Sequence, residues 1–457
     1  MERMKDERNM GGRPVSFRRD LIRQVLDVLT SGESCSLVGV GSSGKSNVAR
    51  HLARRDVLAY HLGARAAACL SVLVNCTDLA EYTPIALHRL MLDALVRALQ
   101  DAVSSPNGAT AKVAALRDQA IESASAERAR INLKDAFAAV FRAGFDQLFV
   151  LLDDFDPVVQ RAPSATLNGL RPFRDDHKRK LMYATFTRRE LAYLRAEARF
   201  QEFYELVAAH TIAIGPYADD DARALVRELS EQWGIGGLSP AAVETLLAWS
   251  GNHPGLLRAI LTAMHRDPSI RVGATEALSR LQSHFDVLPE CEHIWESLEA
   301  EEQAALIAIA RGTAPTERDG LRPLEAKGVI HMRAGGCAIR SPIFAAFVAS
   351  QLPSQADRGP FEFDPARNEV RINGYPIRDL SPVELSLLRR ICERYPQPAS
   401  RADLLADMLN HESLARQYGG SPEARLSQYL AGLKRRLDLI KLDCLRIYPD
   451  GACQLVL

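Results

Sequence analysis

A run of eight residues, Gly39–Ser46, reads GVGSSGKS and matches the pattern GxxxxGK[ST] at every fixed position. In such a glycine-rich turn, backbone N–H groups can point inward and meet the concentrated negative charge of phosphate oxygens. Lys45 adds a cation for the β and γ phosphates, and the Ser46 hydroxyl is a suitable oxygen ligand for Mg²⁺. The pattern therefore predicts a site for ATP and Mg²⁺.

The flanking sequence favours this interpretation. An apolar run at Cys35–Val38 has the character of a short strand, and a helical pattern starts near Lys45. The first turn of that helix would add its positive dipole end to the site. An ordinary turn of glycine and serine is the alternative. The residues expected to contact the nucleotide in this stretch are Gly39, Gly41, Ser43, Gly44, Lys45, Ser46 and Asn47.

The same three glycines also spell GxGxxG, a pattern found in dinucleotide sites. Such a site needs an acid at the end of the next strand to hold a ribose hydroxyl. Here the next apolar run, Leu70–Val74, ends in Asn75 and Cys76. The Lys45–Ser46 pair favours a triphosphate instead.

Two acids follow another buried strand. The apolar residues Phe149–Leu152 precede Asp153 and Asp154, at the strand end where open α/β sheets bind ligands. We expect Asp153 to hold Mg²⁺ through water, together with Ser46, and Asp154 to orient the attacking water. ATPases with fast turnover usually have a glutamate at this position, and Asp154 is shorter by one methylene. We therefore expect slow hydrolysis of ATP. The alternative is that Asp154 and Asp156 simply begin a loop.

A further strand candidate, Leu181–Thr187, is followed by two arginines. A hydroxyl or a cation at this strand end could sense the γ-phosphate, and Arg188 is the candidate for a catalytic role. The alternative is that Thr187 caps a helix and is followed by surface arginines.

The stretch before the first predicted helix could border the base of the nucleotide. Residues 1–14 form a polar lead-in, and Asp20–Leu29 has helical spacing of its apolar residues. Between them lie Phe17, Arg18 and Arg19, and we expect the two arginines to contribute to nucleotide binding.

Length and pattern predict several domains. Strands alternate with helices over residues 1–215, which predicts an α/β fold with a parallel sheet buried on both faces. Residues 216–285 show helical patterns only and predict a helical lid. Residues 290–351 combine helices with a short hairpin, the outline of a winged helix. A polar linker, 352–360, precedes a last domain at 361–457.

Composition excludes several classes of protein. The 457 residues are 47% hydrophobic and 25% charged with a formal net charge of zero, typical of a globular chain without a basic footprint. No apolar run long enough for a membrane span and no secretory signal is visible, so we expect a cytoplasmic protein and no membrane partner. The eight cysteines form no CxxC pair, and HExxH and GxSxG are absent, so the sequence favours neither zinc nor nucleophilic chemistry.

The first 265 residues resemble the STAND and Orc-like branch of the AAA+ ATPases. The matching features are Phe17–Arg19, the phosphate loop, LLDDFD at 151–156 and Gly251–Pro254. The last resembles the GxP signature of the helical lid, although two residues rather than one separate its glycine and proline. The resemblance implies that His253 or Pro254 lies near the β-phosphate, and that ATP switches the protein to an open or oligomeric state. The alternative is that Gly251 ends one helix and Pro254 begins the next.

Residues 361–457 resemble the winged-helix effector domain of OmpR/PhoB-type transcription regulators. The matching order is two strands, Leu380–Glu384 leading a first helix with a capping box, Arg401–Leu405 in a second, a third helix at about 422–439 and a closing hairpin. The resemblance implies binding to duplex DNA. Gly432 departs from it, because the family often has a basic or polar residue there. Residues 290–351 resemble the module that couples such ATPases to their effectors.

The third helix has a physical pattern of its own. Leu426, Leu430, Leu433 and Leu437 form one buried stripe, which leaves other positions for base edges and phosphates. A solvated face is the alternative, because residues 361–457 hold 14 Lys and Arg against 13 Asp and Glu, a net charge of +1. The candidate DNA-binding residues are Arg425, Ser427, Gln428, Lys434 and Arg435.

The leading hypothesis is a slow ATPase that acts as a nucleotide-switched, DNA-binding regulator of transcription. One alternative is an ATP-dependent oligomeric assembly or defence protein that acts through an unknown protein partner. Another is an Orc-like helper that remodels DNA. Homo-oligomers that form with ATP and show no preference for a DNA sequence would favour the assembly or defence protein. Binding of duplex DNA by residues 1–285 alone would favour the DNA-remodelling helper.

Overall fold

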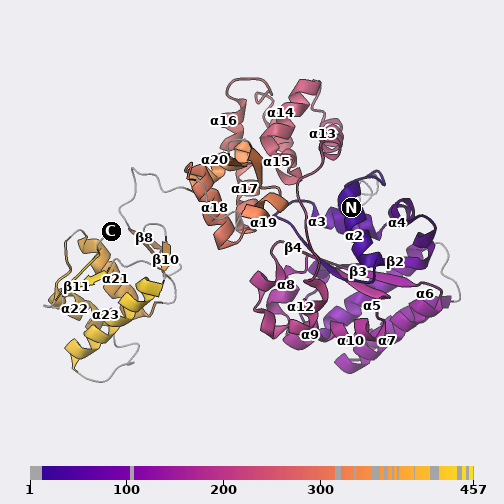
Figure 1. Ribbon diagram of the computed structural model, residues 1–457, viewed down its shortest axis with the longest axis horizontal. Coiled ribbons are helices and arrows are strands. Elements are labelled where there is room, and N and C mark those ends of the chain that lie inside the picture. The colour runs from indigo at the N-terminus through magenta and orange to yellow at the C-terminus, as the bar shows by residue number, and fades with distance from the viewer. Residues whose placement is uncertain are drawn as a thin grey trace. The chain divides into compact units, whose positions relative to one another are not determined.

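The structure is a computed structural model in which the chain divides into two compact units, Met1–Gln351 and Leu352–Leu457. Each is considered by itself below and is coloured along the chain in Figure 1. The residues that the structure describes are 13–102, 108–313, 321–333, 336–351, 361–364, 369–372, 375–377, 380–395, 397–411, 421–439, 445–448 and 452–455.

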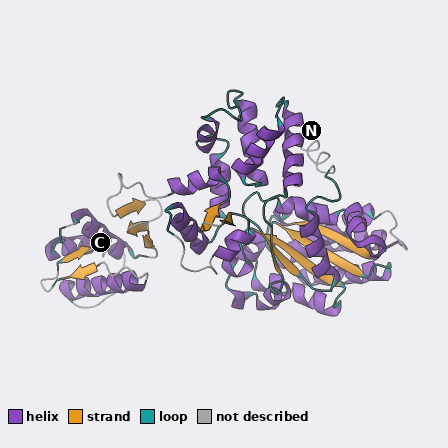
Figure 2. Cartoon of the chain, turned by 45° about the horizontal axis from the view of Figure 1, so that its top comes forward, coloured by secondary structure: helices purple, strands orange, loops and turns teal. Residues whose placement is uncertain are grey.

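The first unit is built on a five-stranded parallel sheet in the order β2-β3-β4-β1-β5, drawn in orange between helices in Figure 2. The predicted α/β class and parallel sheet are confirmed. The short strand β5 was not predicted, because three residues give no readable periodicity. The five strands are β1 (Cys35–Val38), β2 (Cys69–Asn75), β3 (Gln147–Asp153), β4 (Leu181–Thr187) and β5 (Thr211–Ala213).

Helices cover both faces of this sheet. On one face lie α2 (Arg19–Thr30), α3 (Lys45–Ala53) and α4 (Arg55–Leu62). The other face and its surroundings hold α5 (Pro84–Asp101), α6 (Ala109–Glu122), α7 (Ala126–Arg142), α8 (Asp156–Arg161), α9 (Ser164–Asn168), α10 (Leu170–Asp176), α11 (Leu191–Leu194) and α12 (Gln201–Val207). Short 3₁₀ turns are found at Gly63–Ala68, Cys76–Asp78 and Glu197–Arg199.

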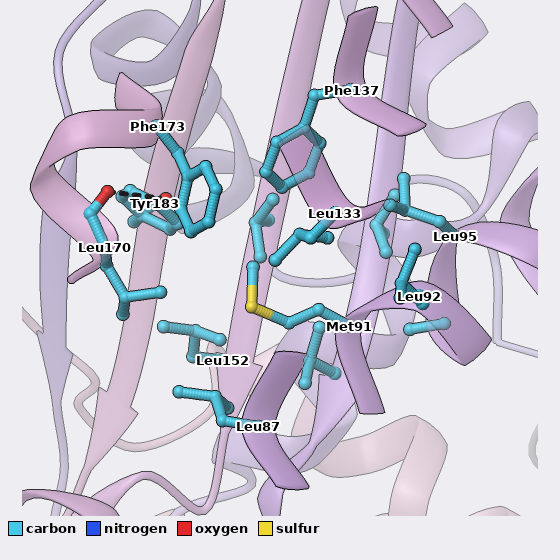
Figure 3. Close-up of a cluster of buried hydrophobic side chains, with 14 of the residues drawn as sticks. Leu87, Met91, Leu92, Leu95, Leu133, Phe137, Leu152, Leu170, Phe173 and Tyr183 are labelled. Carbon is cyan, nitrogen blue, oxygen red and sulfur yellow. Dashed lines mark hydrogen bonds between the residues drawn. The ribbon is translucent and has the colours of Figure 1, made fainter. Parts of the chain in front are cut away.

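Strand β3 shows why the sheet needs helices on both sides. Leu148 and Leu152 belong to the core under α5 and α7, whereas Phe149 and Leu151 belong to the core under α3. Figure 3 shows the first core, where Leu152 lies among side chains of α5, α7 and α10. There the Tyr183 hydroxyl donates to the Leu170 carbonyl oxygen at 3.0 Å, which satisfies the polar end of a fully buried ring. An uninterrupted apolar strand is the pattern expected for such burial.

A second part of this unit follows β5. Its elements are α13 (Asp219–Trp233), α14 (Pro240–Ser250), α15 (Pro254–Arg266), α16 (Ala277–Gln282), α17 (Leu288–Glu296), α18 (Ala300–Ala310), α19 (Arg322–Ala326), the hairpin β6 (Ile330–Arg333) and β7 (Gly336–Ile339), and α20 (Pro342–Ser350). One continuous hydrophobic core runs through these elements. The helices and the hairpin agree with the sequence, and the division into a lid at 216–285 and a coupling module at 290–351 stays a prediction.

The second unit has the predicted order of elements around its own core. Ser381 caps α21 in a capping box with Glu384, as the sequence indicates. Strand β10 was not predicted. The linker 352–360 and residues 449–451, between the two strands of the closing hairpin, lie outside the described residues. The elements are β8 (Phe361–Asp364), β9 (Glu369–Ile372), β10 (Tyr375–Ile377), α21 (Pro382–Arg394), α22 (Arg401–His411), α23 (Pro422–Leu439), β11 (Leu445–Ile447) and β12 (Cys453–Leu455).

Candidate functional site

The phosphate loop connects β1 to α3 at the carboxyl edge of the parallel sheet. Gly44 is the N-cap of α3 and has a φ of 90°, a conformation that L side chains rarely adopt. Ser42 also has a positive φ, 51°. The loop therefore turns sharply and leads directly into the positive end of α3, which is the geometry that phosphate binding needs.

Lys45 lies folded into this loop. Its Nζ donates to the carbonyl oxygens of Gly39 at 2.8 Å and Val40 at 2.9 Å, and the residue is 7% exposed. Burial lowers the pKa of Lys45 to about 8, while the carboxylates of Asp156 and its neighbours oppose that shift. The side chain thus holds a buried positive charge inside the loop at pH 7, where the phosphates of a nucleotide would lie.

The predicted metal pair is brought together. The Ser46 hydroxyl donates to Asp153 Oδ1 at 3.2 Å, and Asp153 ends β3 and is buried. Burial, with the adjacent charge of Asp154, raises the pKa of Asp153 to about 6. A bound cation would relieve that cost, because it favours the ionised carboxylate. Within the described part of the chain no three His, Cys, Asp or Glu side chains could hold a metal alone. Mg²⁺ here would need phosphate or water oxygens besides Ser46 and Asp153.

The two candidate catalytic residues lie at the same edge of the sheet. Asp154 is half-buried with a φ of 49°, and Arg188 directly follows β4 with an exposed side chain. Thr187 is the last residue of β4, so the alternative in which it caps a helix is wrong. Arg188 is close enough to Lys45 to lower its pKa, which places both cations near the phosphate loop. Asn47 lies on α3 and is half-buried.

The two arginines expected near the nucleotide base, Arg18 and Arg19, differ in their surroundings. Arg18 is buried and its Nη2 donates to the carbonyl oxygens of Ser43 at 2.8 Å and Gly215 at 2.9 Å. Its guanidinium lies over the ring of Tyr217, 4.6 Å from the ring centre. Arg19, by contrast, begins α2 and is exposed. Arg18 therefore joins the phosphate loop to the chain after β5, and Arg19 does not.

Sequence reasoning missed Tyr217. It lies beside the phosphate loop, with its ring edge-on to Phe17 at 5.3 Å between centres. A Cβ at Gly44 would lie 3.3 Å from the Tyr217 hydroxyl oxygen. Because Tyr217 is 173 positions from Gly44 in the chain, only the folded structure shows that they are neighbours.

Buried polar atoms around the loop fit a polar ligand. Within the described residues, Arg18 Nε, Ser43 Oγ, Thr187 Oγ1 and the Tyr217 hydroxyl have no hydrogen-bond partner. Buried polar groups are nearly always paired, so these four atoms around one loop leave hydrogen-bonding capacity that a polar ligand could use. With the charge of Lys45 and the Ser46–Asp153 pair, they suit a nucleotide with Mg²⁺.

His253, at the start of α15, contacts the phosphate loop. It is the N-cap of α15: its Nδ1 accepts from the N–H of Leu256 at 3.2 Å, and its Nε2 lies 3.0 Å from the carbonyl oxygen of Gly41. Burial lowers the pKa of His253 to about 3, so the ring is neutral at pH 7 and Nε2 carries the proton that it donates to Gly41. Gly251 ends α14 and Pro254 begins α15, as the capping alternative has it.

The end of helix α17 contacts the same residue, Gly41, through its N–H. The Gly41 N–H donates to Ser297 Oγ at 2.9 Å, and a Cβ on Gly41 would lie 2.5 Å from the His293 carbonyl oxygen. The Arg189 guanidinium donates to the carbonyl oxygens of Glu296 at 2.8 Å and Leu298 at 3.1 Å, just after α17 ends. No local sequence pattern could have revealed the hydrogen bond between Gly41 and Ser297, because the two residues are 256 positions apart.

We expect Gly41→Ala to destabilise the first unit by about 1–3 kcal/mol, the usual cost of an overpacked site. The added methyl would force the His293 carbonyl and α17 away from the loop. Gly236→Ala is the matched control, because a Cβ there has no neighbour within 4 Å. Thermal unfolding of both variants tests this, and equal unfolding temperatures would show that the loop tolerates the methyl.

Helix α23 of the second unit presents the predicted face. Its leucine stripe is buried, and Ser427, Gln428 and Arg435 are exposed on the opposite side, with Arg425 and Lys434 half-buried on the flanks. Ser427 and Arg435 donate to backbone carbonyl oxygens of their own helix. The face is therefore polar and accessible within this unit, while its role in DNA binding stays a prediction.

Gly432→Ala should raise the stability of the second unit by about 1 kcal/mol, since glycine is that much poorer than alanine inside a helix. Among the described residues, a Cβ at Gly432 would meet only Glu384 Oε1, at an ordinary 3.4 Å. The reverse change at exposed Ala431, Ala431→Gly, should lower it by a similar amount. The unfolding midpoint of this unit measures both, and a fall for Gly432→Ala would contradict the expectation.

Comparison with known proteins gives structural likenesses only. No protein-family profile and no curated protein matches the chain. It is similar to the Walker-type ATPase PABY2304 of Pyrococcus abyssi, with a TM-score of 0.47 and 15% identity over 72% of this chain and 95% of that one. It is also similar to the Aeropyrum pernix Orc1 protein in complex with DNA, with a TM-score of 0.35 and 14% identity over 96% and 88% of the two chains. A third likeness is Cdc6p of Pyrobaculum aerophilum, with a TM-score of 0.32 and 15% identity over 74% and 94%.

With TM-scores below 0.5, these likenesses do not identify a function. Function is therefore inferred from the geometry of the phosphate loop. Among the described residues no helix is both long and apolar enough to cross a bilayer.

Proposed function

We propose that the chain binds ATP with Mg²⁺ and is a nucleotide-switched regulator that presents its C-terminal unit to duplex DNA. The observation that carries the proposal is the loop Gly39–Ser46 with Lys45 buried inside it and Ser46 hydrogen-bonded to Asp153. The phosphate loop with Lys45 and Ser46, and Asp153 at the end of β3, come from separate parts of the sequence and meet at one sheet edge. Hydrolysis would use Asp154 and Arg188 and would be slow.

The contacts of Gly41 support a switch. Its carbonyl oxygen faces His253 of the lid, and its N–H faces Ser297 just after α17. A nucleotide that reorients the two peptide groups flanking Gly41 would alter both contacts. If the nucleotide binds more tightly to one arrangement of α15 and α17, its binding shifts the protein toward that arrangement.

The DNA-binding part rests on α23. An exposed helix face with Ser427, Gln428 and Arg435 suits base edges and phosphates, and the surrounding elements follow the order of a winged helix. The winged-helix likeness is an analogy of architecture, and such domains also bind proteins.

The deciding experiment compares the affinity of duplex DNA for the full chain and for a chain that ends at residue 351, with and without ATP, over a salt series. We expect tight binding that needs residues 361–457, shifts with ATP and weakens with salt by a slope of about −0.9 for each phosphate contacted. Arg435→Ala should reduce that slope, and Arg389→Ala, which removes an exposed arginine of α21, is the charge-matched control. Equal binding by the shortened chain would overturn the DNA role of the C-terminal unit.

The near-neutral charge of residues 361–457 favours a second candidate, an ATP-dependent assembly that acts through a protein partner. DNA binders usually carry a basic patch. Light scattering with ATP and without DNA tests it: an ATP-dependent oligomer that ignores DNA would favour this candidate, and a monomer under all conditions would remove it.

A further inference from the structure

Asp156 is the first residue of α8 and lies three positions after Asp153. Both of its carboxylate oxygens accept the backbone N–H of Arg188, at 2.9 and 3.2 Å. Close by, the N–H of Phe155 donates to the carbonyl oxygen of Phe186 at 3.1 Å. The start of α8 is therefore fastened to the end of β4, where the chain leaves the sheet at the nucleotide site.

Two cations near the phosphate loop, Lys45 and Arg188, act on Asp156. After burial, Asp156 is the strongest influence on the pKa of Lys45 and opposes its fall. Burial raises the pKa of Asp156 itself, while the Arg188 N–H, Lys45 and the Arg188 charge all oppose that rise. One half-buried carboxylate thus faces both Lys45 and Arg188.

Asp154 is the acid that sequence reasoning favours for the γ-phosphate end of the site, but its contacts differ from those of Asp156. The backbone N–H of Asp154 donates to the Asp153 carboxylate, and the φ of Asp154 is 49°. Among the described residues its side chain makes no hydrogen bond or ion pair. Nothing in these contacts ties Asp154 to Arg188 or to β4.

We propose that Asp156 is a positioning residue for the γ-phosphate end of the nucleotide site: its carboxyl fixes the end of β4, and thereby Arg188, opposite the phosphate loop. This rests on the proposed ATP binding and adds a residue that determines specificity for the triphosphate. The physical reason is that Arg188 has a long, exposed side chain, so the position of its backbone sets where the guanidinium can reach. ATP and ADP differ only in the γ-phosphate, so loss of this positioning should change their ratio of affinities.

The test uses the full chain with fluorescent ATP and ADP analogues and Mg²⁺, and compares Asp156→Ala, Asp156→Asn and Asp154→Asn with the wild type. We expect Asp156→Ala to lower the ATP-to-ADP affinity ratio about tenfold, the effect of one hydrogen bond to a charged group. ADP affinity should stay within about twofold. Asp156→Asn should keep the ratio, because its amide oxygen still accepts the Arg188 N–H. Asp154→Asn tests the alternative, that the ratio depends on Asp154 instead.

A double-mutant cycle shows whether Asp156 acts through Arg188. Arg188→Ala removes the guanidinium but keeps the backbone N–H, so it should lower the ratio by itself, and adding Asp156→Ala should cause little further loss. If Asp156→Ala does not fold, Asp156→Glu displaces the carboxyl by one methylene and gives the same comparison in a milder form.

The outcomes separate this proposal from the one on which it rests. A wild-type chain that binds neither nucleotide overturns the proposed function and this inference with it. A chain that binds both, but whose ratio is unchanged by Asp156→Ala, overturns this inference alone. Additive losses in the double mutant, or a loss caused by Asp154→Asn and not by Asp156→Ala, also overturn it.

Discussion

Replacing Lys327 by methionine is expected to destabilise the first unit by about 3–5 kcal/mol, the cost of leaving one partner of a buried ion pair without the other. Lys327 Nζ lies 2.6 and 2.8 Å from the two carboxylate oxygens of Glu302. The two side chains are only 4% and 6% exposed. In Lys327→Met, the Glu302 charge would remain in the protein interior with no cation to balance it.

The matched control is the double variant Glu302→Gln/Lys327→Met. Glu302 also accepts the backbone N–H of Glu299 in the capping box of α18, and glutamine can do the same. The double variant therefore removes the charge and keeps the cap, and we expect it to recover most of the lost stability. Thermal unfolding of the full chain measures both. A single variant as stable as the wild type would show that the pair is hydrated in solution.

The parts of the fold that the sequence predicts correctly are those with a local cause. The boundaries of β1 follow from an apolar run that stops at a glycine, and α21 begins where Ser381 and Glu384 complete a capping box. The leucine stripe of α23 is buried as its spacing of four, three and four residues predicts. Each of these signals lies within a few residues of the feature that it specifies.

The parts that sequence reasoning could not supply depend on distant residues. Arg18 was expected at the base, and the structure shows it bonded to the backbone of Ser43 and Gly215. Ser297 reaches Gly41 from a different part of the unit. Asp154 and Asp156 are equivalent by residue type, and only the position of the end of β4 distinguishes them.

This division explains why the phosphate loop could be read directly and its surroundings could not. A loop that binds phosphate is made by one continuous stretch of chain, so its glycines, lysine and serine have fixed spacing. The residues that hold that loop come from the start of α15, from the turn after α17 and from the ends of two strands, at no fixed spacing. Their types, such as one histidine or one serine, are too common to indicate a role before the chain is folded.

Lys45→Ala is expected to weaken ATP binding about 100-fold, which corresponds to ~2.8 kcal/mol and is near the upper end for a hydrogen bond to a charged group. The ammonium is already desolvated inside the loop, where, among the residues that the structure describes, it donates only to the Gly39 and Val40 carbonyl oxygens. Phosphate oxygens would therefore gain a charge-assisted partner whose burial has already been compensated in the folded chain. Titration with a fluorescent ATP analogue measures the loss.

Folding and binding can be separated in the same experiment. Alanine at position 45 removes a buried charge whose pKa burial lowers to about 8, so the variant should unfold at or above the wild-type temperature at pH 7. Lys178→Ala, at an exposed lysine of the same unit, should leave both ATP affinity and unfolding unchanged. If Lys45→Ala folds normally and binds ATP within about threefold of the wild type, the loop does not bind phosphate through Lys45. The buried polar atoms around Tyr217 would then have to serve another ligand.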